Sequence, residues 1–282
     1  MAIRLGENNY GKQRVRLLKR SKRGDSYDIK ELTLGIRLEG DFETAHTQGD
    51  NRKILPTDTM KNTVYALARQ HSIEPPEQFC LRLLEHFLSR DAQVSRAQID
   101  ASETLWVRLS TASGQFHPHT FMRSGDEKRT ASVCGSRDEQ TVSAGIEGLV
   151  VLNATNSAFE HFRRDEYTTL KEDRNRILAT AIHARWTYRS GSMRFDETWN
   201  GVRQALLETF AAHDSESLQQ TLYAMGAAAL KRFQDIPEIS LSLPNKHYNL
   251  VDLSPLELDN PGEIFLPTDE PHGLIEATLR ND

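Results

Sequence analysis

Apolar and polar residues alternate strictly in several short segments, which predicts β-strands with one buried and one solvated face. The clearest segment is 32–39, whose apolar positions are Leu32, Leu34, Ile36 and Leu38. The same alternation begins again at Val15 and recurs at 105–109 and 239–243. The chain is therefore expected to form antiparallel strands.

Apolar residues at helical spacing occur in two pairs of segments. The first pair is 60–68 and 79–88, separated by Glu74-Pro75-Pro76, and the second pair is 199–210 and 218–229. Asp196 is expected to be the N-cap of the third helix. Candidates for the N-cap of the fourth are Asp214, Ser215 and Ser217.

The order strand, strand, helix, helix, strand, strand thus occurs twice, with the helix pairs offset by about half the chain, which suggests a duplicated unit. The two halves share no convincing residue-by-residue identity, so this prediction rests on the pattern. Polar stretches at 124–129 and 135–139 bracket the expected boundary. We predict units at 1–137 and 138–282, and an α+β fold with helices packed on one face of each antiparallel sheet.

The composition of the 282 residues, 38% hydrophobic and 27% charged, is that of an ordinary folded protein. A formal net charge of −5 opposes general nucleic-acid binding. Cys80 lies in a helical apolar stretch, so we expect a buried free thiol and a reducing compartment. Residues 1–10 contain no apolar segment of signal-peptide length, and no run of about 18 apolar residues occurs, which favours a cytoplasmic protein without a membrane partner.

Several motifs that usually carry chemistry are missing, among them a Gly-rich phosphate loop, a dinucleotide fingerprint and a Cys-x-x-Cys pair. His117-Pro118-His119 comes nearest to a metal site, but two histidines without an obvious third ligand favour a structural role. We therefore expect no metal. In Pro56-Thr57-Asp58-Thr59, either Thr57 or Asp58 is an N-cap on local grounds, although free N–H groups at a helix start also favour anions.

Other polar and aromatic residues look ordinary when each is taken alone. Lys12 would lie on a solvated strand edge, Phe159 in a core, and Arg176 on the surface, while Gln219 lies just inside a helix start. The cluster Pro244-Asn245-Lys246-His247-Tyr248 is harder to explain as a turn, because it follows a strand directly and contains no glycine.

Together and in order, five stretches of the chain resemble the urate oxidase, or uricase, family. The resemblance is carried by Tyr10-Gly11-Lys12 with Val15-Arg16, Thr57-Asp58-Thr59-Met60-Lys61-Asn62-Thr63, Asn156-Ser157-Ala158-Phe159, Arg164-Asp165-Glu166-Tyr167-Thr168-Thr169-Leu170 and Leu243-Pro244-Asn245-Lys246-His247-Tyr248. It extends from about Tyr10 to 273–275, nearly the whole chain.

The chain departs from the family pattern at two places. His161 stands where the family often has a glycine, shortly after the Phe159 position, and this would alter a turn. The chain ends in Leu279-Arg280-Asn281-Asp282 rather than in a peroxisomal tripeptide, which points to a bacterial enzyme.

The resemblance implies the tunnelling fold, in which each subunit carries two units of the order described above and subunits close into a barrel with a central tunnel. A homo-oligomer, expected to be a homotetramer, would then have its active sites at subunit interfaces. The implied reaction converts urate, oxygen and water to 5-hydroxyisourate and hydrogen peroxide, with no cofactor.

The resemblance also implies the residues that would bind urate. Arg176 is similar to the arginine that clamps the pyrimidine edge, where a planar guanidinium pairs with two acceptors. Gln219 would face the same edge, Leu218 would offer its backbone N–H, and Phe159 would be the stacking platform. Thr57 and Asp58, from a neighbouring subunit, would meet the five-membered ring.

Four residues resemble the family's catalytic groups. Asn245 matches the asparagine that holds oxygen, and later water, above the ring. Lys12, Thr57 and His247 match a proton relay in which the lysine activates the threonine hydroxyl. A lysine acting as a base near neutral pH needs its pKa lowered from the usual ~10.4.

Two alternatives remain open at this point. A metal-dependent tunnelling-fold enzyme acting on pterins or GTP would use His or Cys ligands, for which His117 and His119 are the nearby candidates. A catalytically silent purine-binding protein needs only Arg176, Gln219 and Phe159. The silent binder is disfavoured because all four catalytic matches are present.

Overall fold

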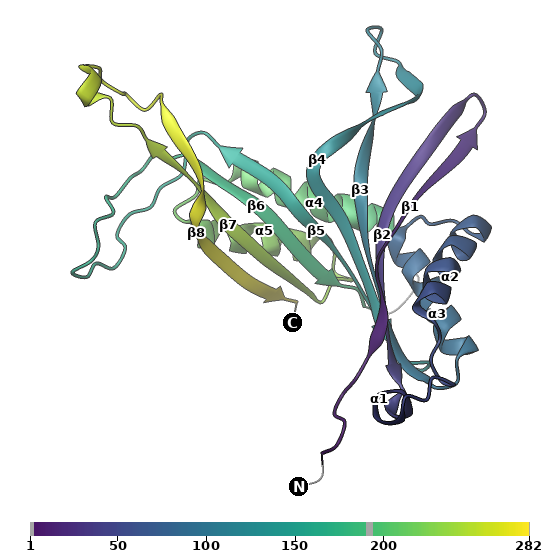
Figure 1. The fold of residues 1–282 in the computed structure, drawn as a ribbon. Helices are drawn as coiled ribbons and strands as arrows, with labels where there is room; N and C mark the ends of the chain where they lie inside the picture. Colours follow the sequence, from purple (N-terminus) through teal and green to yellow (C-terminus); the bar gives the residue numbers. More distant parts are fainter. Residues whose placement is uncertain (1–2, 190–193, 282) are drawn as a thin grey trace. The chain divides into compact units, whose positions relative to one another are not determined.

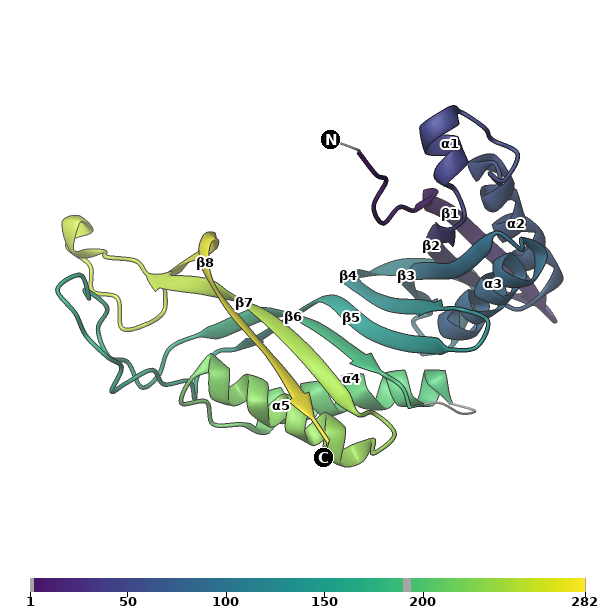
Figure 2. The ribbon, with the colours of Figure 1, turned by 90° about the horizontal axis from the view of Figure 1, so that it is seen from below.

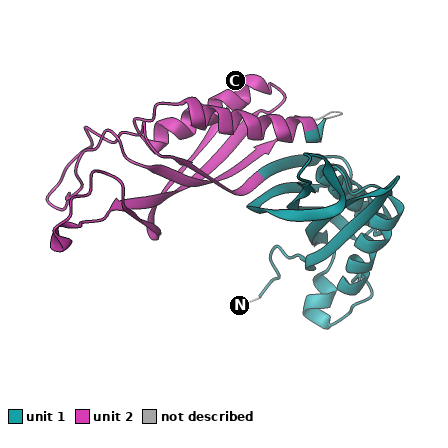
Figure 3. Ribbon diagram, turned by 90° about the horizontal axis from the view of Figure 1, so that it is seen from above, with its two compact units in different colours: residues 1–145, 190–196 teal, residues 146–189, 197–282 magenta. Residues whose placement is uncertain are grey.

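The computed structural model describes residues 3–189 and 194–281. The chain divides into two compact units, shown in different colours in Figure 3. Unit 1 contains residues 1–145 and 190–196, and unit 2 contains residues 146–189 and 197–282. The predicted repeat boundary between 137 and 138 lies in the turn before the fifth strand, and as a boundary of the repeat it stays a prediction.

Unit 1 contains antiparallel strands that pair in chain order, together with the first helices. Its elements are β1 (Tyr10–Arg23), β2 (Ser26–Gly40), α1 (Glu43–Gln48), α2 (Thr57–Gln70), α3 (Pro76–Arg90), β3 (Val94–Ser110) and β4 (Phe116–Gly135). Helix α2 packs on β1, and α3 packs on β3 and β4 (Figure 1). The predicted face of 32–38 is buried against Met60, Val64 and Phe79, as the alternation and helical spacing require.

Unit 2 repeats the order of two strands, two helices and two strands. Its elements are β5 (Gln140–Asn153), β6 (Leu178–Thr187), α4 (Phe195–Ala212), α5 (Leu218–Arg232), β7 (Glu238–Leu250), the 3-10 turn η1 (Ser254–Leu256) and β8 (Phe265–Arg280), with β5 and α4 beginning in residues of unit 1. Strands β6, β7 and β8 pair as antiparallel neighbours, and α4 and α5 cover one face of the unit's strands (Figure 2). The predicted α+β class with antiparallel strands is confirmed.

Strand β3 extends past the helices that pack on it, and this changes the expectation of a buried face at 105–109. The pattern at 105–109 predicted a buried face, yet Val107 is 45% exposed, whereas Ala97, Ile99 and Ala101 earlier in the strand are buried. Figure 1 shows β3 and β4 continuing beyond the unit's helices, so these helices do not cover this part. The alternation identified the strand correctly, but it did not show that the unit's helices leave this part of the strand uncovered.

Two polar segments that were expected outside strands lie within them. Residues 124–129 belong to β4, where Gly125 has a φ of 62°, and 244–248 belong to β7. The expected N-caps also differ, because Asp196 lies inside α4, while Ser217 is confirmed as the cap of α5. In the described part of the chain, the helices are too short or too polar to cross a membrane.

Candidate functional site

A cavity of about 350 Å³ in unit 2 brings together Phe159, Arg176, Asn245 and His247, four of the predicted site residues. This volume is within the range of small-molecule sites. The remaining lining comes from the loop before β6 and from β7 and comprises Leu170, Lys171, Asp173, Ile177, Lys246, Tyr248, Asn249 and Leu250. The cavity therefore presents an aromatic ring, an amide, an imidazole and cations to one ligand.

Backbone hydrogen bonds fix the segments that carry Phe159 and Arg176. The Phe159 amide donates to the Asp173 carbonyl at 2.7 Å, and the Asp173 amide donates back to the Phe159 carbonyl at 3.3 Å. The Arg176 amide donates to the Ser157 carbonyl at 2.9 Å. As a result, the Arg176 guanidinium carbon lies over the Phe159 ring, 5.0 Å from its centroid.

The Arg176 side chain is half-buried, which corrects its interpretation as a surface charge. Burial lowers the pKa of its guanidinium, and the Asp173 carboxylate opposes this shift. Its Nε is buried without a hydrogen-bond partner within the described residues. Because an unpaired buried donor of a charged group is costly, this nitrogen is suited to an acceptor supplied by a ligand. An anion with acceptors on a flat edge fits this position.

Strand β7 supplies Asn245 and His247 on either side of an irregularity in its pairing with β8. In that register Asn245 is opposite Gly273 and His247 is opposite Thr268. The buried Thr180 hydroxyl donates to the Pro244 carbonyl at 2.8 Å and so fixes the strand next to Asn245. A bulge of this kind re-aims side chains, and here both residues line the cavity.

Leu218 and Gln219 are the first two residues of α5 and do not line the cavity. Leu218 is buried and Gln219 is exposed. The Ser217 hydroxyl accepts from the Gln220 amide at 3.2 Å, so this cap leaves the first two amides of the helix for another acceptor. The Ala158 amide donates to the Ser215 carbonyl at 2.7 Å, which links this helix start to the Phe159 segment.

Thr57 and Asp58 open helix α2 in unit 1, and their interpretation as N-caps is wrong. The N-cap is Pro56, whose side chain has no acceptor and makes no cap hydrogen bond. The Asp58 carboxylate instead binds Lys61 and accepts from the Asn62 side-chain amide at 3.0 Å. Lys61 lowers the pKa of Asp58, and the charge of Lys12 contributes in the same direction.

Lys12 lies on β1 opposite Ile36 and is half-buried. At the preceding Gly11, an added Cβ would lie 1.8 Å from the Ile36 carbonyl oxygen, so only glycine permits this close approach of β1 to β2. The Tyr10 hydroxyl accepts from the Leu55 amide at 2.9 Å. This bond holds the segment before α2 to the strand that carries Lys12.

The predicted site residues thus form two sets. Lys12, Thr57 and Asp58 belong to unit 1, and the other six belong to unit 2: Phe159, Arg176, Leu218, Gln219, Asn245 and His247. The roles assigned to them stay predictions. The sequence patterns did not single out Lys171 and Asp173, which also line the cavity, and they included Lys246 in a motif without giving it a role. The signal for Lys171 was its place directly after the Arg164–Leu170 motif.

The His117 and His119 rings lie 4.6 Å apart in an edge-to-face arrangement on β4. Over the residues that the structure describes, no group of three or more His, Cys, Asp or Glu side chains is arranged to hold a metal ion. Cys80 is a buried free thiol, as expected, and Cys134 is also free.

Comparison with known proteins adds to this geometry. The family model described as Uricase matches residues 8–134 and 142–276. A uricase from Arthrobacter globiformis is 46% identical over 278 residues, covering 99% of this chain and 90% of that protein. One from Aspergillus flavus is 39% identical over 286 residues, covering 96% and 94%. The chain belongs to the uricase family.

A crystal structure of the Arthrobacter globiformis uricase matches the fold with a TM-score of 0.94 at 45% identity, covering 100% of this chain and 96% of that one. Membership of the uricase family makes the chain an enzyme that oxidises urate. The family resemblance carried by the five motifs is confirmed. The uricase match does not support the pterin or GTP enzyme or the silent purine binder.

Proposed function

We propose that the chain oxidises urate with molecular oxygen and water to 5-hydroxyisourate and hydrogen peroxide, without a cofactor. The observation that carries this proposal is Arg176, which lines the cavity with its guanidinium over the Phe159 ring and whose buried Nε has no hydrogen-bond partner among the described residues. Urate is a flat purine trione that is anionic at neutral pH. It can offer its ring face to the phenyl group and its acceptors to the guanidinium.

The position of Arg176 supports an in-plane clamp. A purine stacked on Phe159 occupies the layer directly over the phenyl ring, and the Arg176 guanidinium carbon lies over the same ring at 5.0 Å. The planar fork then pairs with two acceptors on the pyrimidine edge. From α5, Gln219 offers an amide that both donates and accepts, and Leu218 offers a backbone N–H at a helix N-terminus.

The chemistry requires that the enzyme stabilise deprotonated urate, which is electron-rich enough to reduce oxygen. Asn245, on the cavity wall, holds oxygen and later water above the ring. Lys12 receives the proton of the Thr57 hydroxyl, and His247 completes the relay. Thr57 and Asp58 meet the five-membered ring largely through backbone N–H groups of a helix start that lacks a side-chain cap.

We also propose a homo-oligomer, a homotetramer, in which subunits close into a barrel with a central tunnel. Each site would combine Lys12, Thr57 and Asp58 of one subunit with the unit 2 residues of another. The exposed pair Val107 and Met122, on neighbouring strands, supports a covered sheet face in the assembly. The cytoplasm is the proposed compartment, and the free thiols are compatible with it.

The test uses protein that has been treated with a chelator and whose metal content has been measured. This protein is mixed with urate in air-saturated buffer. Urate absorbance should fall while oxygen is consumed and peroxide appears in equal amounts. Loss of urate that depends on an added metal or flavin, or no loss at all, would exclude the cofactor-free reaction.

Arg176→Ala serves as the site variant in the same assay. It should bind urate far more weakly, because breaking a buried charge pair costs about 3–5 kcal/mol. Arg163→Ala is the matched control, since Arg163 is exposed and does not line the cavity. If Arg176→Ala bound urate within about twofold of the parent, Arg176 would not be the clamp.

A further inference from the structure

We propose that Phe162 and Arg164 are positioning residues that hold the Phe159 ring in the plane in which urate stacks. This inference rests on the proposed role of Phe159 as the platform. It gives a task to the Arg164–Leu170 motif, which marks the family but contributes none of the reacting groups assigned above. The inference is carried by a stack of side chains that continues behind the platform.

The Phe162 ring is stacked on the Phe159 ring, with centroids 5.0 Å apart and planes inclined by 14°. Such an offset, nearly parallel pair is a favourable aromatic geometry. Phe159 and Arg176 line the cavity, whereas Phe162 does not. Phe162 therefore covers one face of Phe159 from outside the cavity lining, and the proposal places the ligand, beside the Arg176 guanidinium, on the other face.

Arg164 continues the stack on Phe162. Its guanidinium carbon lies 4.8 Å from the Phe162 ring centroid, within the range of a cation–π contact. The same guanidinium donates through Nη1 to the Leu170 carbonyl at 3.2 Å, and its Nη2 lies 3.7 Å from the Glu172 carboxylate. Leu170 lines the cavity. Arg164 therefore contacts both Phe162, which supports the Phe159 ring, and the backbone of a second residue of the cavity wall.

The residues between Arg164 and Leu170 form a turn that makes this connection possible. The Asp165 carboxylate accepts from the Thr168 hydroxyl at 2.8 Å and from the Tyr167 amide at 3.0 Å. The Thr168 hydroxyl accepts from the Asp165 amide at 2.9 Å. These reciprocal bonds close the turn, so Leu170 returns to Arg164. The motif thus fixes two segments around one aromatic ring.

The test is an anaerobic titration with urate, which reports binding without turnover, combined with steady-state kinetics in air. Phe162→Leu keeps an apolar side chain but removes the flat ring, and should bind urate about 3- to 10-fold more weakly. Its kcat at saturating urate should change less than its KM. Phe162→Tyr should restore parental binding, and Arg164→Met should resemble Phe162→Leu. Arg163→Met, the neighbouring exposed arginine, is the control and should bind like the parent.

A double-mutant cycle separates positioning from general stability. If Phe162 acts through Phe159, then Phe162→Leu should weaken urate binding less than twofold when Phe159→Leu is already present. The inference would be overturned if Phe162→Leu weakened urate binding by its full amount in the Phe159→Leu background, or if Phe162→Leu alone bound urate like the parent. Neither result would contradict the role of Phe159 as the platform. If Phe159→Leu itself bound urate normally, both the platform and the inference would be wrong.

Discussion

His161 has a backbone φ of 56°, in the left-handed region that favours glycine, within the loop that follows Phe159. Its amide donates to the Glu172 carboxylate at 3.2 Å, and its side chain is exposed. The left-handed conformation therefore accompanies a hydrogen bond of the His161 backbone amide, and the imidazole takes no part in that bond. A glycine, which the family resemblance led us to expect here, would adopt this φ without strain, and the chain keeps the turn with histidine.

His161→Gly is expected to leave urate oxidation unchanged and to raise stability by at most about 1 kcal/mol. Relief of the left-handed strain is worth about 1–2 kcal/mol, and the greater freedom of glycine in the unfolded chain cancels part of it. Thermal melting measures the change. Arg163→Gly is the control, because Arg163 has no positive φ and glycine there should only destabilise. Equal losses in both variants would show that His161 carries no strain.

Single residues were the hardest part to predict from the sequence. Lys12 and Arg176 looked like surface charges, but both are half-buried, and Thr57 and Asp58 looked like helix caps although Pro56 takes that position. Local pattern cannot show these environments, because they depend on segments distant in the chain, such as Ser157 bonding Arg176. Only the ordered set of motifs led to the prediction that these residues form a site.

Helices and strands were predicted well because their signals are local. The spacing of Phe79, Leu83, Leu84 and Phe87 predicted a buried helix face, and the cap Ser217 was one of three candidates. The errors occurred where burial depends on the length of neighbouring layers, as at Val107, or where a polar run lies inside a long strand, as at 124–129.

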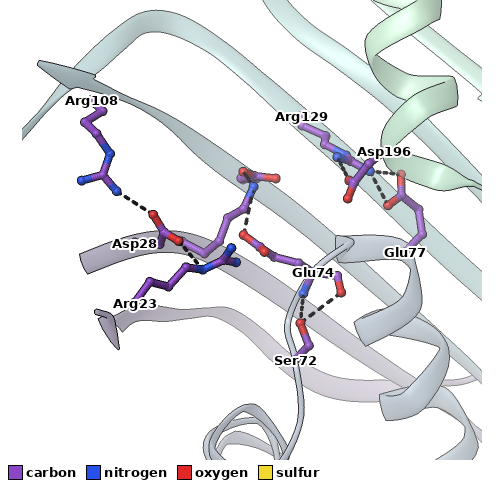
Figure 4. Close-up of polar contacts among 10 residues, drawn as sticks. Arg23, Asp28, Ser72, Glu74, Glu77, Arg108, Arg129 and Asp196 are labelled. Carbon is purple, nitrogen blue, oxygen red and sulfur yellow. Dashed lines mark hydrogen bonds and ion pairs between the residues drawn. The ribbon is translucent and has the colours of Figure 1, made fainter. Parts of the chain in front are cut away.

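The sequence patterns also gave no sign of a buried ionic cluster in unit 1, which includes Glu77 in the first turn of α3. Figure 4 shows Arg129 of β4 between the carboxylates of Glu77 and Asp196. Its Nη2 donates to both oxygens of the fully buried Glu77, at 3.1 and 2.8 Å, and its Nη1 bonds Asp196 at 2.5 Å. Burial raises the pKa of Glu77, and Arg129 acts in the opposite direction.

Arg129→Met should lower the free energy of unfolding by about 3–5 kcal/mol near neutral pH, because the Glu77 carboxylate would remain buried without its cation. The pKa of Glu77 would then rise further above its unfolded value. Protonated Glu77 favours the folded state at low pH, and this contribution is lost as pH rises through the folded pKa. The deficit should therefore shrink on acidification, as followed by denaturant unfolding at several pH values.

The control for this prediction is the double variant Glu77→Gln with Arg129→Met, which removes the buried charge together with its partner. Replacing a whole buried pair is often nearly neutral, so stability and its pH dependence should return toward those of the parent. If Arg129→Met were as stable as the parent at neutral pH, or equally destabilised at every pH, the ionic interpretation of the cluster would be wrong.

At the scale of the whole molecule, the proposed site residues divide between the two compact units. Unit 1 carries the proposed relay residues Lys12 and Thr57, and unit 2 carries the proposed aromatic platform and guanidinium clamp. On this proposal, neither set alone would both bind and oxidise urate. If subunits associate so that one chain's unit 1 meets another chain's unit 2, every site depends on assembly, and a monomer should be inactive.

Complementation between two inactive variants tests this arrangement. Thr57→Ala damages the unit 1 half of each site, and Arg176→Ala damages the unit 2 half, so each homo-oligomer should be nearly inactive. When the two variants are unfolded together and refolded, a mixed pair of subunits contains one site with both defects and one with neither. In a cyclic pair with two shared sites, random mixing at equal amounts predicts about a quarter of parental activity.

Differently tagged subunits and sequential affinity purification would show that mixed oligomers form. As a control, Thr57→Ala should be mixed with Lys12→Met. Both of these changes lie in the same half of the site, so every site in the mixture would combine one damaged half with an intact one. That mixture should remain nearly inactive. Recovery in the first mixture and not in the second would place the two halves on different subunits, whereas equally low activity in both, with mixed oligomers present, would place them on one.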